Sequence, residues 1–318
     1  MKYLRRVGSY WAIAALFSAM GCATTGTTDP GLYARPFPYP VELPGASIEV
    51  YKHASDRDLN LYIFNPRGHH AGDRRATIVF FFGGGWNNGS PGQFYAHAAY
   101  FTSRGMVVAL ADYRVRSRDG VLAADCVRDG KSAIRYLRAN ARRLGVDPLR
   151  IAAGGGSAGG HVAASTGLLP GMDEPTEDYR VRSTPNALVL FNPVLVTAAT
   201  DSVALPEARL ARLRDRLGVD LEALSPYHHV KPGLPPTIVF HGTDDTTVPF
   251  ETARVFVEAM REAGNRCELA AYDGRGHGFF NFTDSSTELF AATVREADRF
   301  LDDVGFLNGR SHVKRFLR

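Results

Sequence analysis

Short apolar runs alternate with longer helix-like segments along most of this chain, and that alternation limits the folds open to it. The runs have the length and continuity of strands buried on both faces of a sheet, and they lie at 77–82, 106–111, 150–153, 187–191 and 237–240, with a last strand at 267–272. The helix-like segments are 94–103, 122–144, 161–169, 251–263 and 287–304. Alternating strands and helices form βαβ units, whose strands are parallel. We therefore predict an α/β fold with a mostly parallel central sheet and helices on both faces.

Two segments depart from this rhythm. Near the start, residues 48–51 and 60–64 flank a polar turn and predict a β-hairpin. Later, residues 195–230 predict an insertion between two strands, with a helix around 206–217, which could cover the functional site. The folded domain is expected to span residues 46–308, followed by a basic tail at 309–318 that extends into solvent.

The N-terminus has the pattern of an export signal. Lys2, Arg5 and Arg6 precede a largely apolar run at 10–20, which is shorter than the roughly 20 residues that span a bilayer. We predict a signal peptide at 1–21, followed by a Thr/Pro/Gly-rich tether at 22–45. The run ends in a sequence similar to a bacterial lipoprotein cleavage box, which would make Cys22 the lipidated residue; ordinary signal cleavage is the alternative. The expected location is the periplasm, as a soluble protein or a membrane-anchored lipoprotein, or the extracellular space.

Charge and cysteine content exclude some partners and leave one pairing open. Without Lys2, Arg5 and Arg6, the 37 basic side chains fall to 34, against 33 acidic ones. This balance gives no reason to expect a nucleic-acid partner, and any membrane contact is expected only through the lipid anchor. Cys126 lies in a predicted helix and Cys267 in a predicted strand, so two separate buried thiols are favoured over a disulfide.

One glycine-rich segment indicates a nucleophile. Gly155-x-Ser157-x-Gly159 follows a predicted strand and precedes a predicted helix. This is the pattern of a nucleophile elbow, in which the chain turns so sharply that side chains at the two glycines would collide with crossing backbone. The turn places the Ser157 hydroxyl beside a helix N-terminus, where free N–H groups favour developing negative charge.

This segment resembles bacterial esterases of the α/β-hydrolase superfamily, namely those related to hormone-sensitive lipase and the acetyl-xylan and feruloyl esterases. The resemblance runs from about residue 77 to 282. The loop Phe82-Gly83-Gly84-Gly85 resembles their His-Gly-Gly-Gly loop, with Phe82 in place of the His. The resemblance implies an oxyanion hole made by the N–H groups of Gly84, Gly85 and Ala158.

The acid and the base follow from two further motifs of this resemblance. His241-Gly242-x-x-Asp245 resembles the loop that presents the triad acid, with Asp244 as a competitor. His277 lies between two glycines after the last predicted strand. We expect His277 to accept the proton of Ser157 and Asp245 to orient the imidazole.

The remaining histidines are assigned structural roles. His161 is expected to pack in the interior, and His241 to support the Asp245 loop. No carboxylate or Cys spacing beside His228 and His229 suggests a metal site, so neither a metal nor a cofactor is expected.

The sequence therefore predicts a serine carboxylesterase acting on small acyl esters through an acyl-enzyme. Export and the resemblance favour an acylated saccharide substrate, with acetyl first and feruloyl second. A serine peptidase of the prolyl-oligopeptidase type, a non-catalytic binding module and an acyltransferase are the alternatives. Trp86 and Asn192 are equally consistent with a pocket or with the core.

Overall fold

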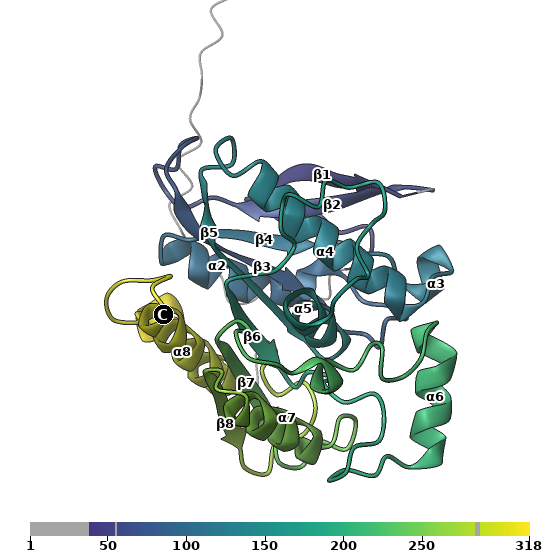
Figure 1. The fold of residues 1–318 in the computed structure, drawn as a ribbon. Coiled ribbons are helices and arrows are strands. Elements are labelled where there is room, and N and C mark those ends of the chain that lie inside the picture. The colour runs from purple at the N-terminus through teal and green to yellow at the C-terminus, as the bar shows by residue number, and fades with distance from the viewer. Residues whose placement is uncertain (1–37, 55, 284–286) are drawn as a thin grey trace, which may run out of the picture.

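A computed structural model describes residues 38–54, 56–283 and 287–318. The predicted signal peptide, Cys22 and the tether as far as residue 37 lie outside the described residues. The chain forms an eight-stranded sheet in the order β1-β2-β4-β3-β5-β6-β7-β8 (Figure 1). The strands are β1 (Ser47–His53), β2 (Asp58–Phe64), β3 (Arg75–Phe81), β4 (Val107–Ala111), β5 (Val146–Gly156), β6 (Ala187–Phe191), β7 (Thr237–Gly242) and β8 (Cys267–Tyr272). Strand β2 is antiparallel to β1 and to β4, and the pairings from β4 to β8 are parallel.

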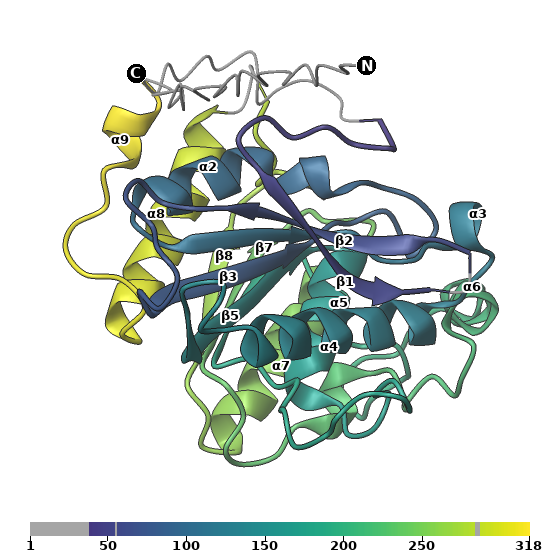
Figure 2. The ribbon, with the colours of Figure 1, turned by 90° about the horizontal axis from the view of Figure 1, so that it is seen from above.

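Helices cover both faces of this sheet, as predicted. Figure 2 shows α2 and α8 above the sheet and α4, α5 and α7 below it. Their bounds are α2 (Tyr95–Ser103), α4 (Ala123–Ala139), α5 (Ala158–Leu168), α7 (Phe250–Glu262) and α8 (Thr287–Asp303). The insertion carries α6 (Glu207–Leu217). Four short helices were not predicted: η1 (Pro91–Phe94), α3 (Arg116–Asp119), η2 (Pro226–His229) and α9 (Val313–Phe316).

The strands are apolar on both faces because each face meets a different layer of helices. Val79 and Phe81 of β3 belong to the core cluster that contains α4, α5 and α7. Ile78 and Phe80 alternate with them and belong to the cluster that contains α2 and α8. Successive strand residues point to opposite faces, so a strand between two helix layers has no polar face. This explains why the strands appear in the sequence as continuous apolar runs.

Both ends of the predicted domain need correction. Val41 and Leu43 are buried in the core, so the folded domain begins before residue 46 and the predicted tether extends too far. The basic tail at 309–318 is not simply solvated, because α9 buries Val313 and Phe316. The ring centroid of Phe316 lies 5.4 Å from that of Tyr100 in α2. Burial of Val313 and Phe316 in the core stabilises the docked segment by more than full solvation of the charges at 314, 315 and 318 would stabilise a free tail.

Two helix boundaries also differ from prediction. Helix α5 begins at Ala158, three residues earlier than predicted, directly after the serine. Glycine is a poor helix former, so Gly159 and Gly160 concealed this first turn. Helix α4 ends at Ala139 rather than 144, where the chain turns through residues 140–145 into β5.

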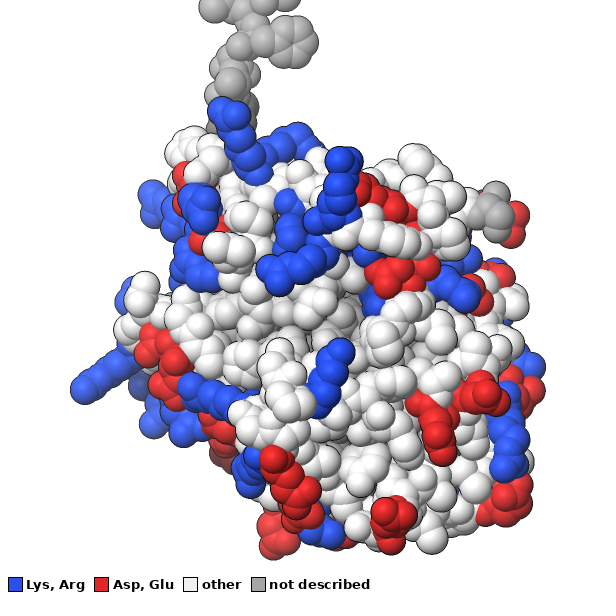
Figure 3. Space-filling view, viewed as in Figure 1, with Lys and Arg blue, Asp and Glu red and all other residues white. Residues whose placement is uncertain are grey.

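Cys126 and Cys267 are separate buried thiols, as the sequence favoured. Figure 3 shows basic and acidic side chains intermixed around one face of the molecule, with a mostly uncharged stretch across its middle. In the described part of the chain, no helix is long and apolar enough to cross a membrane.

Candidate active site

Ser157 lies at the sharp turn between β5 and α5. Its backbone has φ 55° and ψ −120°, a region that residues with a side chain rarely adopt. The surrounding backbone holds this conformation, because the Ser157 N–H donates to the Phe191 carbonyl at 2.9 Å and the Ser157 carbonyl accepts from the His161 N–H at 3.0 Å. The turn therefore presents the Ser157 side chain at the carboxyl end of the sheet, where open α/β sheets bind ligands.

The two glycines of the elbow are required for the reason that the sequence suggested. A Cβ on Gly159 would lie 2.1 Å from the carbonyl oxygen of Phe81, and a Cβ on Gly155 would lie 2.4 Å from that of Gly159. Both distances are far inside van der Waals contact. Helix α5 can thus cross closely behind β3 only without side chains at these positions.

The structure brings Ser157, Asp245 and His277 into one hydrogen-bonded line. Nε2 of His277 lies 2.9 Å from Oγ of Ser157, and Nδ1 lies 2.7 Å from Oδ2 of Asp245. The three residues come from the β5–α5 turn, the loop after β7 and the loop after β8, and His277 is 120 residues from Ser157 and 32 residues from Asp245 along the chain. The side chain of His277 is 24% exposed, whereas that of Asp245 is fully buried. This geometry is that of a serine–histidine–carboxylate triad.

Asp245 is held as a buried carboxylate by hydrogen bonds on both oxygens. Oδ1 accepts from the N–H groups of Thr247 at 2.9 Å and Val248 at 2.8 Å. Oδ2 faces His277, and also Nε2 of His241 at 3.3 Å. Burial acts to raise the pKa of Asp245, but the hydrogen bonds from His241, His277 and the Val248 N–H outweigh it and hold the pKa below its ordinary value.

The competing residue Asp244 points elsewhere. It is exposed, and Oδ1 accepts a hydrogen bond from the Thr243 hydroxyl at 3.2 Å. His241 takes the supporting position expected for it, because its Nε2 also lies 2.8 Å from the Val248 carbonyl. The carboxylate that meets His277 is therefore that of Asp245.

The glycine-rich loop after β3 lies against the elbow. A Cβ on Gly83 would lie 3.3 Å from that of Ser157. Gly84 and Gly85 have φ values of 124° and 64°, which favour glycine. Gly85, Ser157 and Ala158 line the same cleft, whereas Gly84 is not among the residues at its wall. The Gly84 carbonyl instead accepts from the N–H groups of Asn87 and Asn88 at 3.1 and 3.2 Å and closes a turn.

Phe82 anchors this loop in place of the family's histidine. Its ring stacks on Tyr113 at a centroid distance of 4.1 Å, and the Tyr113 hydroxyl donates to the Phe82 carbonyl at 2.5 Å. A second chain of hydrogen bonds joins the loop to the His277 loop. The Gly83 N–H donates to the side chain of Gln93 at 2.6 Å, which donates to Asn281 at 3.0 Å, which donates to the Gly278 carbonyl at 2.8 Å. Gln93 and Asn281 were not predicted, because neither belongs to a motif.

Asn192 and Trp86 can now be placed. Oδ1 of Asn192 accepts from the Gly278 N–H at 3.0 Å, so this buried residue holds the His277 loop and is not part of the cleft wall. Trp86 is 4% exposed and still lines the cleft. Its indole N–H donates to Nδ1 of His161 at 3.3 Å, and Nε2 of His161 lies 2.7 Å from the Leu224 carbonyl. His161 is therefore an interior residue, as expected.

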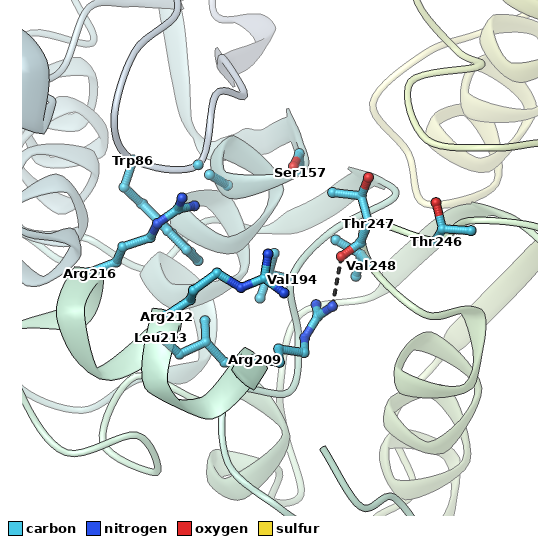
Figure 4. A pocket seen from close by; sticks show the side chains of 12 residues that line it. Trp86, Ser157, Val194, Arg209, Arg212, Leu213, Arg216, Thr246, Thr247 and Val248 are labelled. Carbon is cyan, nitrogen blue, oxygen red and sulfur yellow. Dashed lines mark hydrogen bonds between the residues drawn. The ribbon is translucent and has the colours of Figure 1, made fainter. Parts of the chain in front are cut away.

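The cleft beside Ser157 has a volume of about 290 Å³, at the small end of the range for ligand pockets. Helix α6, which lies in the predicted insertion, forms one wall of the cleft. Figure 4 shows the side chains of Arg209, Arg212 and Arg216 extending from α6 into this cleft. These arginines were not predicted to belong to the site, although their spacing of three and four residues indicates one helix face.

Among the described residues, no group of three or more His, Cys, Asp or Glu side chains could hold a metal ion. His228 and His229 face the hydroxyl of Ser225 and the carbonyl of Ala223, at 2.7 and 3.2 Å.

Solved structures similar to this chain include an esterase. The apo form of esterase 2 from Thermogutta terrifontis is 53% identical, with a TM-score of 0.82, and the match covers 86% of this chain and 100% of that one. The same esterase has been solved with butyrate bound, at 51% identity and a TM-score of 0.82, with the same coverage of 86% and 100%.

Curated relatives are more distant and longer. Esterase LipC of Mycobacterium tuberculosis is 32% identical over 226 residues, which are 64% of this chain and 53% of LipC. The probable isoprenylcysteine alpha-carbonyl methylesterase ICMEL1 of Arabidopsis thaliana is 28% identical over 298 residues, 87% of this chain and 60% of that protein. This chain thus spans little more than half the length of these two relatives.

Two family models match the chain. The Dienelactone hydrolase family matches residues 224–304, which include Asp245 and His277. BD-FAE matches residues 61–260, which include β3, the elbow and α6. The chain therefore belongs to the BD-FAE family, within the α/β-hydrolase superfamily.

Proposed function

We propose that this protein is a serine carboxylesterase that hydrolyses small acyl esters through an acyl-enzyme. The observation that carries the proposal is the hydrogen-bonded line from Ser157 through His277 to Asp245 at the base of an open cleft. The similarity to proteins named esterases supports the same reaction class.

The first half of the reaction forms the acyl-enzyme. Nε2 of His277 takes the proton of Ser157 as Oγ attacks the ester carbonyl carbon, and Asp245 stabilises the resulting imidazolium. The carbonyl oxygen becomes negative and is held by the N–H groups of Gly85 and Ala158, which line the cleft, while Gly84 closes the turn that positions Gly85. The C–O bond to the alcohol then breaks, and His277 donates its proton to the leaving oxygen.

The second half releases the acid. A water molecule gives a proton to His277 and attacks the acyl carbon, and the ester bond to Ser157 breaks with return of that proton to Oγ. If an alcohol replaces water, the same steps transfer the acyl group, so the two outcomes differ only in the acceptor.

The acyl group is proposed to be small. A cleft of about 290 Å³ suits an acetyl or feruloyl group better than a long chain, and the Thermogutta esterase was solved with butyrate bound. We retain acetyl and feruloyl groups on a polysaccharide as the proposed natural esters.

The test of the proposed function is labelling together with substitution. A serine-directed phosphonate is expected to inactivate the protein and to add its mass to the peptide that contains Ser157. Ser157→Ala should lower the hydrolysis of an aryl acetate by roughly 10⁴-fold or more, with an unchanged circular dichroism spectrum. Hydrolysis at the wild-type rate by Ser157→Ala would contradict the mechanism. Cleavage of a proline-containing peptide amide in preference to esters would favour the peptidase, and no turnover of either would favour a binding module.

We also propose export, with lipidation at Cys22. In cell fractions, the wild type should be found with membranes, and Cys22→Ser should be released as a soluble and active esterase. A mature N-terminus beyond Cys22, measured by mass spectrometry, would rule out the lipid anchor and leave ordinary export.

A further inference from the structure

Three arginines form a basic stripe on the face of α6 that lines the cleft. Arg209, Arg212 and Arg216 are spaced by three and four residues, so they share one side of the helix. They line the same cleft as Ser157 and point into it from the side of α6 (Figure 4).

Arg216 reaches the oxyanion loop. A Cβ on Gly85 would lie 2.8 Å from Nη1 of Arg216, so the guanidinium lies directly over this glycine. A group bound to Ser157 and facing the Gly85 N–H would therefore have a positive charge beside it. Glycine at 85 both permits the positive φ and leaves space for the guanidinium.

Arg209 holds the other end of the stripe. Its Nη1 donates to the Thr247 carbonyl at 2.7 Å, which ties α6 to the Asp245 loop. Its Nε is buried and has no hydrogen-bond partner among the described residues. Burial and the neighbouring charge of Arg212 lower the pKa of Arg209, although the carboxylate of Asp245 acts in the other direction.

Among the described residues, no carboxylate at the wall of the cleft pairs with the stripe. No Asp or Glu is among the residues that line the cleft, and neither Arg212 nor Arg216 forms an ion pair with a described residue. Within the described part of the chain, Arg212 donates to the Ala208 carbonyl, at 3.2 Å. Asp245 is already occupied by its hydrogen bonds to the histidines and backbone.

The other charges of α6 are paired away from the cleft. Glu207 pairs with Arg214 at 2.5 Å, and Asp215 with Arg116 of α3 at 2.5 Å. The helix therefore has its ion pairs outside the cleft and its other guanidinium groups inside it, where the Asp215 and Asp245 carboxylates act on Arg216 and Arg209 from beyond ion-pair distance. Like charges held together with few counter-charges repel one another, and an anion placed between them lowers that cost.

We propose that the preferred ester carries a carboxylate, and that Arg212 and Arg216 bind this group while the ester carbonyl lies at Ser157. The inference rests on the proposed esterase function and specifies its substrate class. The carboxylate can belong to the acyl part, as in a monoester of a dicarboxylic acid, or to the alcohol part, as in an acylated uronic acid. The recognition chemistry is the same in both, because a guanidinium pairs two N–H groups with two carboxylate oxygens.

The experiment compares two matched pairs of esters. Mono-4-nitrophenyl adipate and 4-nitrophenyl hexanoate place or omit a carboxylate on the acyl side. 4-Acetoxybenzoate has a carboxylate on the alcohol side, and its methyl ester lacks that charge. The measured quantity is the ratio of kcat/KM for the charged ester to that for the neutral ester. In the wild type, this ratio should exceed one in the pair whose carboxylate reaches the stripe, and raised salt should lower it.

Single substitutions then test the arginines. Arg212→Gln and Arg216→Gln should each lower this ratio by about tenfold, mainly through KM. Arg214→Gln is the matched control, because it removes the same charge from the same helix but outside the cleft, and it should leave the ratio at its wild-type value.

Two results would overturn the inference. A ratio unchanged by both substitutions would do so, and if kcat/KM for the charged and the neutral ester fell equally, that result would assign Arg216 to the oxyanion loop. A ratio equally lowered by Arg214→Gln would show a general effect of net charge. Failure of the wild type to hydrolyse any of the four esters would contradict the proposed function itself.

Discussion

At Asp245, hydrogen bonds from two backbone N–H groups and two imidazoles converge on one carboxylate. Each donor favours the charged form, so the group stays ionised although it is fully buried. These hydrogen bonds fix the orientation of the carboxylate group. The carboxylate in turn fixes the orientation of the His277 ring through its hydrogen bond to Nδ1. The neighbouring Asp244 has none of these partners, although it is adjacent in the chain.

These contacts predict different effects for the two aspartates. In Asp245→Asn, one position of the carboxylate becomes an NH₂ group, which cannot accept from His277, so kcat for an aryl acetate should fall roughly 10⁴-fold. Asp244→Asn should stay within about twofold of the wild type, because exposed changes away from the site have small effects. Steady-state kinetics of both variants make the comparison, and the reverse ranking would assign the triad acid to Asp244.

At the scale of elements, the short helix α9 shows how a terminal segment becomes part of the fold. Val313 and Phe316 are buried, while Lys314 and Arg315 between them are exposed. The segment is joined to α2 by more than the Phe316 ring, because Nε2 of His312 lies 2.8 Å from the Ser103 hydroxyl. A helix with two apolar residues at this spacing covers part of the core cluster that contains α2 and α8.

Removal of α9 should therefore destabilise the whole domain. A chain that ends at Gly309 is expected to lose about 3 kcal/mol of unfolding free energy, since a buried Val or Phe contributes about 1.5–3 kcal/mol. Urea unfolding of the truncated chain measures this loss. The double variant Lys314→Ala and Arg315→Ala, which keeps the apolar residues, should unfold within about 0.5 kcal/mol of the wild type. If the double variant loses stability and the truncated chain does not, the result would support the expectation that residues 309–318 form a basic tail in solvent.

At the scale of the whole molecule, the two helix layers bury two neutral histidines, one on each face of the sheet. Burial lowers the pKa of His97 to about 3. Its ring lies among aromatic side chains, with centroids 4.8 Å from Phe290 and 4.9 Å from Phe94. Neither ring nitrogen of His97 has a hydrogen-bond partner among the described residues. Burial also lowers the pKa of His161, to about 4, although its hydrogen bond to the Leu224 carbonyl opposes this.

These two histidines make stability depend on pH in a fixed direction. Between about pH 6.5, the ordinary value for histidine, and pH 4, the unfolded chain binds protons at both residues and the folded protein does not. Unfolding therefore takes up protons, so the stability present above pH 6.5 is lost as the pH falls, by up to about 1.4 kcal/mol per pH unit for each histidine.

His97→Phe isolates one of the two histidines. It removes two buried nitrogens without partners and should raise the unfolding free energy at pH 7 by about 1 kcal/mol. It should also reduce the slope of unfolding free energy against pH between pH 6 and pH 4.5, because one histidine fewer binds a proton on unfolding. Guanidinium unfolding at a series of pH values measures both effects, and His97→Leu controls for the larger ring. An unchanged slope in both variants would show that His97 is protonated in the folded state.

The sequence alone was sufficient for the strand pattern and the α/β class, and it named the three residues that the structure joins by hydrogen bonds. Each of these depends on a requirement that acts along the chain: continuous apolar residues where a strand has two buried faces, glycine where a Cβ would strike the backbone, and a polar residue in the loop after a strand. Ser157, Asp245 and His277 could be predicted from the glycines and apolar strands next to them in the chain, although they come from three separate loops.

Only the tertiary structure decided what surrounds the triad. The placement of the arginines of α6 opposite Ser157, the link from Gly83 through Gln93 to Asn281, and the packing of α9 on α2 join segments far apart in sequence. None of these residues is constrained by its chain neighbours, since an arginine, a glutamine or a terminal phenylalanine is tolerated at many exposed positions. Their roles arise from the packing of distant elements, which balances burial against solvation over the whole core.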